Sequence, residues 1–298
     1  MLNLHPDSQA RTSHCYKVAG QFLGSTLEFS RLKYFEVQDA QESKIDPSDF
    51  HRLATTHPSL LRYAGEAPFA GRTRRLELYV DGVHARIVID GANAYRVDTA
   101  KRLAVCCLPD PASDLALELL LGPVAVLFFE ALERYFLHAA CVATPDGLLA
   151  FIAESGVGKS TLSASAGDDW QQVADDVIAI DAQAKFIVAD YPQLKLPNAI
   201  SPAAQKMADQ ELPLAGIVRL SPIEAEQISI NRMAPAHALL QVIRHTVGAK
   251  LFDAEQLKRH MQFAQRVAHQ YPMWECSYPR DMDNLAEVRQ QICKAVAT

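Results

Sequence analysis

One segment constrains the fold of this chain more than any other: a short apolar run that leads into two glycines and then into Lys-Ser-Thr. Residues 148–152 are apolar, Gly156 and Gly158 follow them closely, and Lys159 opens a stretch with helical character. A strand, a tight glycine loop and a helix, in that order, let backbone N–H groups converge on phosphate oxygens. The segment therefore predicts a triphosphate-binding loop at the end of a strand.

The residue types of this loop assign each position an expected role. Lys159 would reach the β- and γ-phosphates of ATP, and the Ser160 hydroxyl would be a ligand of Mg²⁺. Ala153 stands where the usual spacing of such a motif has glycine, and alanine there still permits a tight turn from strand to loop. The residues expected to bind the nucleotide are Ser155, Gly156, Val157, Gly158, Lys159, Ser160 and Thr161.

Composition limits the classes of function open to this chain. Its 298 residues suit one large or two ordinary domains, and 49% apolar with 21% charged residues is typical of a soluble globular protein. A net charge of −6 argues against sequence-independent binding to nucleic acid, which needs clustered cations. We therefore expect no nucleic-acid partner.

Membrane and compartment signals favour the cytoplasm. The longest apolar stretch, 115–132, is interrupted by Glu118, by Gly122-Pro123 and by Glu130, so it predicts a buried helix or two helical pieces. The first twelve residues lack the cationic and apolar regions of a secretory signal. Six cysteines scattered without metal-type spacing are typical of a reducing compartment. We expect a cytoplasmic location and no membrane partner.

The fold class expected is α/β, in the α+β sense, with two domains. Residues 1–112 would form a smaller β-rich domain, in which 76–97 predicts a meander of strands. Prolines between 43 and 70 predict a loop with a short helix. Ser113 is a good helix N-cap after a proline-containing break, so the boundary is placed there and the second domain spans 113–298.

Helices and strands alternate after residue 113. The helical stretch precedes a strand at 135–143, and a Pro145-Asp146-Gly147 turn connects it to a strand at 148–153, so a hairpin leads into the glycine loop. Further strands are expected at 172–174, 177–180, 217–220, 228–230 and 273–278, and helices at 236–247, 254–269 and 282–296. The apolar face of the helix at 254–269 is expected to comprise Leu257, Met261, Ala264 and Val267.

Two adjacent carboxylates, Asp175 and Asp176, follow the glycine loop at short spacing. Phosphoryl transfer needs carboxylates to hold a cation and a base to take the proton of the acceptor. Adjacent residues of a strand face opposite ways, so both can serve one site only if the strand ends or bulges there. We interpret one of them as a Mg²⁺ partner and the other as the group that orients the acceptor.

His138 lies within an apolar strand just ahead of the glycine-loop hairpin. A lone histidine in such a strand is more often a core residue than a catalyst. Trp170, Trp274 and Tyr191 are interpreted as core or rim aromatics, whereas Lys195 and Arg244 are cations that could complete a phosphate site.

These residues together carry a resemblance to a known family. Leu137-His-Ala-Ala-Cys-Val142, the segment 149–161 and Val173-Ala-Asp-Asp-Val177 resemble the HPr kinase/phosphorylase superfamily, whose kinase core is also that of phosphoenolpyruvate carboxykinases. In that family a strand histidine, a Gly-x-Gly-Lys-Ser loop and an Asp-Asp pair follow one another at similar spacing. The likeness is strong over 113–190 and weaker from there to the C-terminus.

The resemblance implies a phosphoenolpyruvate-carboxykinase-like P-loop kinase core with four catalytic residues. Lys159 would bind the phosphates, and His138 would lie beside the transferred phosphoryl group. Asp175 would act as the base and Asp176, with Ser160, as the metal partner, in an order that the residues leave open. The implied cofactors are ATP and Mg²⁺.

Two departures narrow this resemblance. The bacterial HPr kinases have a glutamate after the loop serine, where this chain has Thr161, and the Arg-Gly-x-Gly segment associated with phosphorylase activity is not found. The length and the start at Tyr16–Gly20 are more similar to the compact HPr-kinase-related proteins, which include kinases that phosphorylate a C-terminal serine of lasso-peptide precursors. The chain is therefore interpreted as a kinase rather than a kinase/phosphorylase.

The function expected is that of an ATP-dependent kinase acting on a serine hydroxyl of a peptide or small protein. A kinase for a free amino acid or hydroxy acid is one alternative. A nucleotide-gated binding module, in which hydrolysis only switches a partner interaction, is another. The sequence leaves the acceptor open and is compatible with a homo-oligomer.

Overall fold

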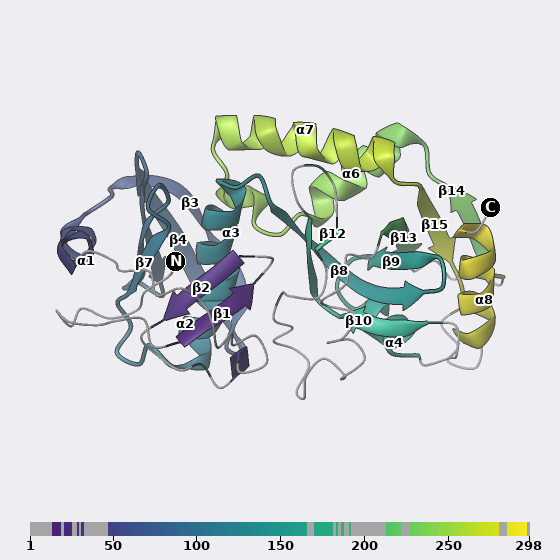
Figure 1. Cartoon of the computed structure of the whole chain (residues 1–298), viewed down its shortest axis with the longest axis horizontal. Helices are drawn as coiled ribbons and strands as arrows, with labels where there is room; N and C mark the ends of the chain where they lie inside the picture. The colour runs from purple at the N-terminus through teal and green to yellow at the C-terminus, as the bar shows by residue number, and fades with distance from the viewer. Residues whose placement is uncertain are drawn as a thin grey trace. The chain divides into compact units, whose positions relative to one another are not determined.

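The computed structural model describes residues 14–18, 21–25, 29, 31–32, 47–165, 170–180, 183, 186–187, 191, 213–221, 227–279 and 285–296. The chain divides into two compact units (Figure 1). Unit 1 comprises Met1–Leu132 with Lys250–Gln256, and unit 2 comprises Glu133–Ala249 with Leu257–Thr298. Both units combine helices with strands, so the chain is an α+β protein.

Unit 1 is built on an antiparallel meander of five described strands in the order β3-β4-β5-β6-β7. The expected meander over 76–97 is confirmed, but the expectation of a loop with a helix over 43–70 is only half right. Helix α1 is present, whereas the rest of that segment forms a long strand, β3, whose exposure alternates along part of its length. Pro68 is tolerated because it lies next to the last residue of a strand at the end of the sheet order. The described elements of this part are β1 (His14–Val18), β2 (Gln21–Ser25), α1 (Pro47–Thr55), β3 (Leu60–Phe69), β4 (Arg72–Asp81), β5 (His84–Ile89), β6 (Ala92–Asp98) and β7 (Leu103–Cys106).

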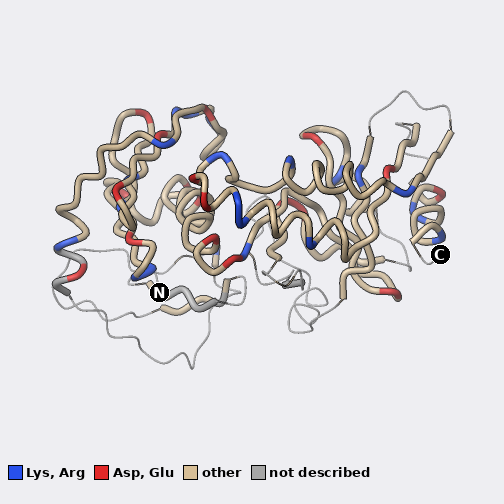
Figure 2. The backbone as a smooth tube through the Cα atoms, turned by 90° about the horizontal axis from the view of Figure 1, so that it is seen from above, with Lys and Arg blue, Asp and Glu red and all other residues tan. Residues whose placement is uncertain are grey.

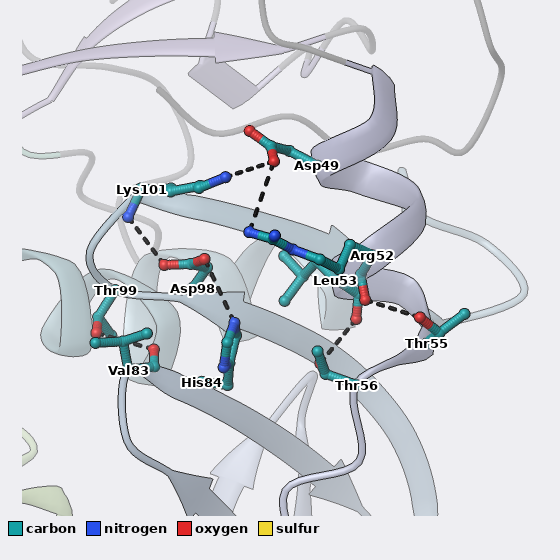
Figure 3. A network of polar contacts seen from close by, with 10 residues as sticks. All are labelled: Asp49, Arg52, Leu53, Thr55, Thr56, Val83, His84, Asp98, Thr99 and Lys101. Carbon is teal, nitrogen blue, oxygen red and sulfur yellow. Dashed lines mark hydrogen bonds and ion pairs between the residues drawn. The ribbon is translucent and has the colours of Figure 1, made fainter.

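A polar network connects helix α1 with the turn that follows β6 (Figure 3). The buried carboxylate of Asp98 accepts a hydrogen bond from the backbone N–H of Lys101 at 2.9 Å and lies 3.5 Å from Nε2 of His84. The ammonium group of Lys101 binds Asp49 of α1. The network therefore holds the short helix against the sheet through charged contacts.

Two short helices complete unit 1 and show why the compact unit extends to Leu132, beyond the boundary that the sequence suggests at 112. The hydroxyl of Tyr95 in β6 donates to the carbonyl of Ala116 at 2.9 Å, and the backbone N–H of Ala70 donates to Glu118 at 2.7 Å. These contacts attach the helices to the strands of unit 1. The segment consists of α2 (Asp114–Leu119), a π-helical turn (Leu120–Val124) and α3 (Ala125–Glu130).

The expected start and interruption of this helical segment are both confirmed. The Ser113 hydroxyl accepts a hydrogen bond from the N–H of Ala116, as an N-cap does. The helix is interrupted at Gly122, whose φ and ψ are not helical, next to Pro123. Within the described residues, no helix is long and apolar enough to cross a membrane.

Unit 2 contains a mixed sheet of eight described strands in the order β12-β11-β8-β9-β13-β15-β14, with β10 also paired to β8. The expected hairpin of β8 and β9 is confirmed. Strands β9, β13 and β15 run parallel to one another, and β14 is antiparallel to β15. The strands are β8 (Tyr135–Thr144), β9 (Gly147–Ile152), β10 (Gln171–Ala174), β11 (Val177–Ile180), β12 (Phe186–Ile187), β13 (Leu214–Ser221), β14 (Ser229–Arg232) and β15 (Met273–Ser277).

Helices α4 (Lys159–Ala164), α6 (Pro235–His245), α7 (Ala254–Gln270) and α8 (Leu285–Val296) accompany this sheet (Figure 1). The core includes apolar residues from β8 and β9, both tryptophans and the inner face of α8. Trp170, Trp274 and Tyr191 are buried, as interpreted from the sequence. Basic and acidic positions are interspersed along the described backbone (Figure 2).

The buried face of α7 differs from the expected one. Leu257 and Met261 are 46% and 43% exposed, whereas His260 and Phe263 are buried together with Ala264 and Val267. The stripe is rotated because the rings of His260 and Phe263 pack against Tyr135 of β8, with centroids 5.3 and 4.4 Å away. Ring packing has overridden the aliphatic pattern.

Candidate functional site

Strand β8 changes partners on both of its edges near His138. On one edge, β9 pairs with residues 139–144 and ends where Ile152 meets Ala139. Beyond that point the same edge of β8 is paired by the residues that follow α6. Thr246 forms an isolated β-bridge with Leu137, and the N–H of Val247 donates to the carbonyl of Phe136 at 2.7 Å. In an antiparallel register this places residue 245 level with residue 138. The exit of β9 into the glycine loop and the end of α6 therefore meet beside His138.

The acidic pair lies on the other edge of β8. Strand β10 pairs with residues 141–143 and β11 with residues 135–138, and Asp175-Asp176 occupy the break between these two strands. The N–H of Ala139 donates to the carbonyl of Asp176 at 3.1 Å. The strand thus ends at the acidic pair, which is the condition under which both carboxylates can serve one site.

His138 and Asp176 are in direct contact. The ring nitrogen Nδ1 of His138 lies 3.2 Å from Oδ1 of Asp176, and the two side chains are 34% and 24% exposed. An ionised carboxylate can only accept hydrogen bonds, so the ring proton belongs on Nδ1, the nitrogen that faces Asp176. In the neutral ring the lone pair then lies on Nε2. His138, which the resemblance implies to be catalytic, is thus a half-buried residue paired with an acid.

The glycine loop requires a backbone that residues with side chains rarely adopt. Gly156 has a φ of +79° and Gly158 a φ of +114°, and nothing lies within 4 Å of a Cβ built on Gly156. The lysine of the loop points back over it: Nζ of Lys159 donates to the carbonyls of Ala153 at 2.7 Å and Glu154 at 3.4 Å. The loop therefore curls around the lysine ammonium group, and Lys159 is buried.

A second cation, Arg244, is joined to the loop by an ion pair with Glu154. The carboxylate of Glu154 lies 2.8 Å from Nε of Arg244, near the end of α6, and both side chains are more than half exposed. Arg244 could be singled out from the sequence but Glu154 could not, because its only signal is that it is an acid next to a loop expected to bind phosphate. The structure therefore joins the loop to α6 by an ion pair at the surface.

His245 is the next residue along α6 and is 6% exposed. Burial lowers the pKa of His245 to about 4; nearby Glu154 acts in the opposite sense, and Lys159, His138 and Arg244 lower it further. His245 is therefore neutral at physiological pH. It lies in the electrostatic field of the loop lysine and of the strand histidine, which the sequence alone does not indicate.

Asp175 is connected to the helix that follows the loop. Nε2 of Gln172 donates to the Ser163 hydroxyl at 2.8 Å and to the carboxylate of Asp175 at 3.4 Å. Gln172 was missed by the sequence analysis because glutamine carries no chemical signature. Asp175 is half-buried.

The end of α4 is held by the core of unit 2. The carbonyl of Ser165 accepts hydrogen bonds from Nε1 of Trp170 and from the guanidinium group of Arg289 in α8, each at 2.9 Å. Arg289 also lies over the Trp170 ring, 5.9 Å from its centroid. These contacts fix the helix that begins with Lys159.

The remaining predicted positions surround the same loop. Ser155, Ser160 and Thr161 are exposed, and Val157 is half-buried. Tyr191 packs on Phe136 with ring centroids 4.8 Å apart, and burial together with the charge of Asp176 raises its pKa. Lys195 lies outside the described residues.

Metal binding at this site would need few protein ligands. Within the part of the chain that the structure describes, no group of three or more His, Cys, Asp or Glu side chains is arranged to hold a metal. Mg²⁺ bound to a nucleotide takes one or two protein oxygens, phosphate oxygens and water. The hydroxyl of Ser160 and the second oxygen of Asp176 have the donor chemistry that this arrangement needs.

A scan against protein-family models finds no match for this chain, and a search of curated proteins finds none either.

Proposed function

We propose that this chain is an ATP-dependent phosphotransferase that moves the γ-phosphoryl group of ATP to a serine hydroxyl of a peptide or small protein. One observation carries the proposal: the glycine loop leaves β9 at the point where β8 presents His138 bound to Asp176. A loop alone supports nucleotide binding. A loop beside an oriented proton acceptor supports transfer to a hydroxyl.

Nucleotide binding would use the loop and the start of α4. The positive φ values of Gly156 and Gly158 give the loop a glycine-type backbone, as a phosphate cradle of converging N–H groups requires. Lys159 would exchange its two carbonyl contacts for phosphate oxygens. When bound, Mg²⁺ would supply charge neutralisation of the phosphates, held by Ser160 and Asp176.

Proton transfer would fall to His138. Its Nδ1 is occupied by Asp176, so Nε2 is the nitrogen that can take a proton. This assignment differs from the one implied by the resemblance, in which Asp175 is the base. His138 is preferred because the charge of the paired Asp176 stabilises a proton taken up by the ring.

The proposed transfer forms one bond to the γ-phosphorus and breaks another. The acceptor O–H loses its proton to Nε2 of His138, its oxygen forms a bond to the γ-phosphorus, and the bond between that phosphorus and the β,γ-bridging oxygen breaks. ADP leaves with the bridging oxygen. Asp176 stabilises the imidazolium cation that forms on His138.

The finer assignments rest on the resemblance to HPr-kinase-like proteins. A core of the phosphoenolpyruvate-carboxykinase type is supported by the hairpin entry into the loop and by the mixed sheet around β8. A peptide acceptor is supported by the likeness to compact kinases of this kind. Transfer to a free hydroxy acid, or hydrolysis alone, are the outcomes against which it is tested.

The test is incubation of the purified chain with γ-labelled ATP and Mg²⁺. A serine-ended peptide, the same peptide with alanine in place of serine, and free serine are offered in parallel. Label on the serine peptide only is the expected result, and Lys159→Met should abolish it while the folded state persists. Label on free serine would support a small-molecule kinase, and orthophosphate alone would support a nucleotide-gated module; either contradicts the proposal.

The choice of base has its own test. His138→Asn should lower kcat by about 10²–10⁴-fold, the usual contribution of a general base. Asp175→Asn should have a clearly smaller effect on kcat. The reverse order of these two effects would return the role of base to Asp175.

A further inference from the structure

Glu154 places a carboxylate where the proposed ligand brings negative charge. Its own backbone carbonyl accepts a hydrogen bond from the loop lysine, so the residue belongs to the wall of the loop. A triphosphate entering the loop would be repelled by this side chain. In the structure, the carboxylate is neutralised by Arg244 at 2.8 Å.

The pair is one that a phosphate can displace. Glu154 and Arg244 are 56% and 60% exposed, and ion pairs at that exposure contribute little in water. Hydrogen bonds between a guanidinium group and a phosphate are charge-assisted and can be bidentate, which makes them stronger than an exposed monodentate pair. Exchange of Glu154 for phosphate would therefore favour the bound state.

The backbone keeps Arg244 beside the proposed reaction centre. The bridge between Thr246 and Leu137 anchors the end of α6 one residue before His138 in β8. His245, which lies between Arg244 and Thr246 in the sequence, is buried and neutral, so it adds no positive charge that would compete with Arg244 for the phosphate. Arg244 can change its partner while its own helix stays in place.

We propose that Arg244 is a ligand of the terminal phosphate of the nucleotide and that Glu154 holds it at the loop until the nucleotide binds. This inference rests on the proposed function and names one more group of the same site. It assigns Glu154 a role opposite to that of Arg244, because the acid competes with the phosphate for the same guanidinium group.

The experiment tests whether substitutions at Arg244 and Glu154 change the affinity for ATP in opposite directions. Affinities for ATP, ADP and AMP are determined in the presence of Mg²⁺ by displacement of a fluorescent ATP analogue. Arg244→Gln should weaken ATP by about 10-fold, the loss of one charge-assisted contact, and ADP by much less. Glu154→Gln should tighten ATP, because it removes both a competitor for Arg244 and a repelling charge.

The reversed pair separates exchange from structure. In the double variant Glu154→Arg with Arg244→Glu, the ion pair can form again but the cation now sits on the loop and the acid on α6. If the pair only supports the fold, the double variant should bind ATP like the wild type. Under the proposal it binds ATP more weakly, because the helix end now presents a carboxylate to the terminal phosphate.

The matched controls are Arg266→Gln and Glu133→Gln, which break another exposed ion pair of unit 2, with 4.0 Å between its charged atoms. Neither should change ATP affinity. Equal ATP affinity of Arg244→Gln and the wild type, or shifts of the same sign for Arg244→Gln and Glu154→Gln, would overturn this inference alone if Lys159→Met still weakens binding. Absence of ATP binding by the wild type would overturn the proposed function as well.

Discussion

Replacement of Gly158 by alanine tests whether the loop backbone is as constrained as its angles imply. Gly158 has a φ of +114°, far from the left-handed well near +57° that other residues can reach. A Cβ there would also lie 3.4 Å from the hydroxyl of Tyr278, a contact at the close end of the normal range. We expect Gly158→Ala to destabilise unit 2 and to weaken nucleotide binding.

The size of the effect follows from the backbone. A residue with a side chain held in such a region costs about 1–3 kcal/mol. Alanine recovers roughly 0.4–1 kcal/mol because it restricts the unfolded chain. The net loss in the free energy of unfolding should be about 1.3 kcal/mol, which corresponds to a decrease of about 0.7 M in the urea midpoint for an m-value of about 2 kcal/mol/M.

Tryptophan fluorescence during urea unfolding is a suitable measurement. The chain has two tryptophans, Trp170 and Trp274, and both are buried in unit 2. Trp170 reports on the loop most directly, because its indole N–H donates to the carbonyl of Ser165 at the end of α4. The urea midpoint and the ATP affinity are determined on the same variants.

Gly156 and Gly91 form a matched pair of controls. Their φ values, +79° and +82°, are nearly equal, and neither has an atom within 4 Å of its built Cβ. Alanine at either should therefore cost a similar free energy, about 1 kcal/mol, followed by circular dichroism for Gly91→Ala because Gly91 lies in unit 1. Only Gly156→Ala should weaken ATP binding. An unchanged urea midpoint for Gly158→Ala, or an equal loss of ATP affinity in Gly91→Ala, would refute the reasoning.

Three further predictions follow from contacts elsewhere. Burial lowers the pKa of His245 and of His260 to about 4, below the unfolded value of 6.5. The free energy of unfolding of unit 2 should therefore be complete above pH 6.5 and should fall towards pH 4 by about 1.4 kcal/mol per pH unit for each group. In urea unfolding, His260→Gln should reduce this slope. Arg289→Met should cost about 1–3 kcal/mol and shift the tryptophan emission, because the carbonyl of Ser165 loses a donor. Asp98→Asn should lower the thermal midpoint of unit 1, measured by circular dichroism. The buried carboxylate, which contacts the N–H of Lys101 and the ring of His84, loses its charge in this variant.

Most elements of both units could be predicted from local pattern. The hairpin before the loop, the N-cap at Ser113 and the interruption at Gly122 depend on neighbours a few residues away, so the sequence contains their causes. Strand β3 was missed because its prolines suggested a loop. The buried face of α7 was misplaced because the packing of Tyr135 against this helix depends on a residue more than a hundred positions away in the chain.

The sequence by itself determined the chemistry available at the site. Two glycines, a lysine after them and a later acidic pair predict phosphate binding and metal binding, since those predictions depend on residue types and spacing. The spacing alone left His138 ambiguous, because a histidine in an apolar strand is more often a core residue, and only the resemblance implied a catalytic role for it.

Only the tertiary structure decided which groups meet. Asp176 reaches His138 because β10 and β11 both pair with one edge of β8 and leave the acidic pair between them. Arg244 reaches Glu154 because the end of α6 continues the opposite edge where β9 stops. Such pairings join residues distant in sequence through sheet register, which no local pattern encodes, and they convert a phosphate-binding motif into a candidate transfer site.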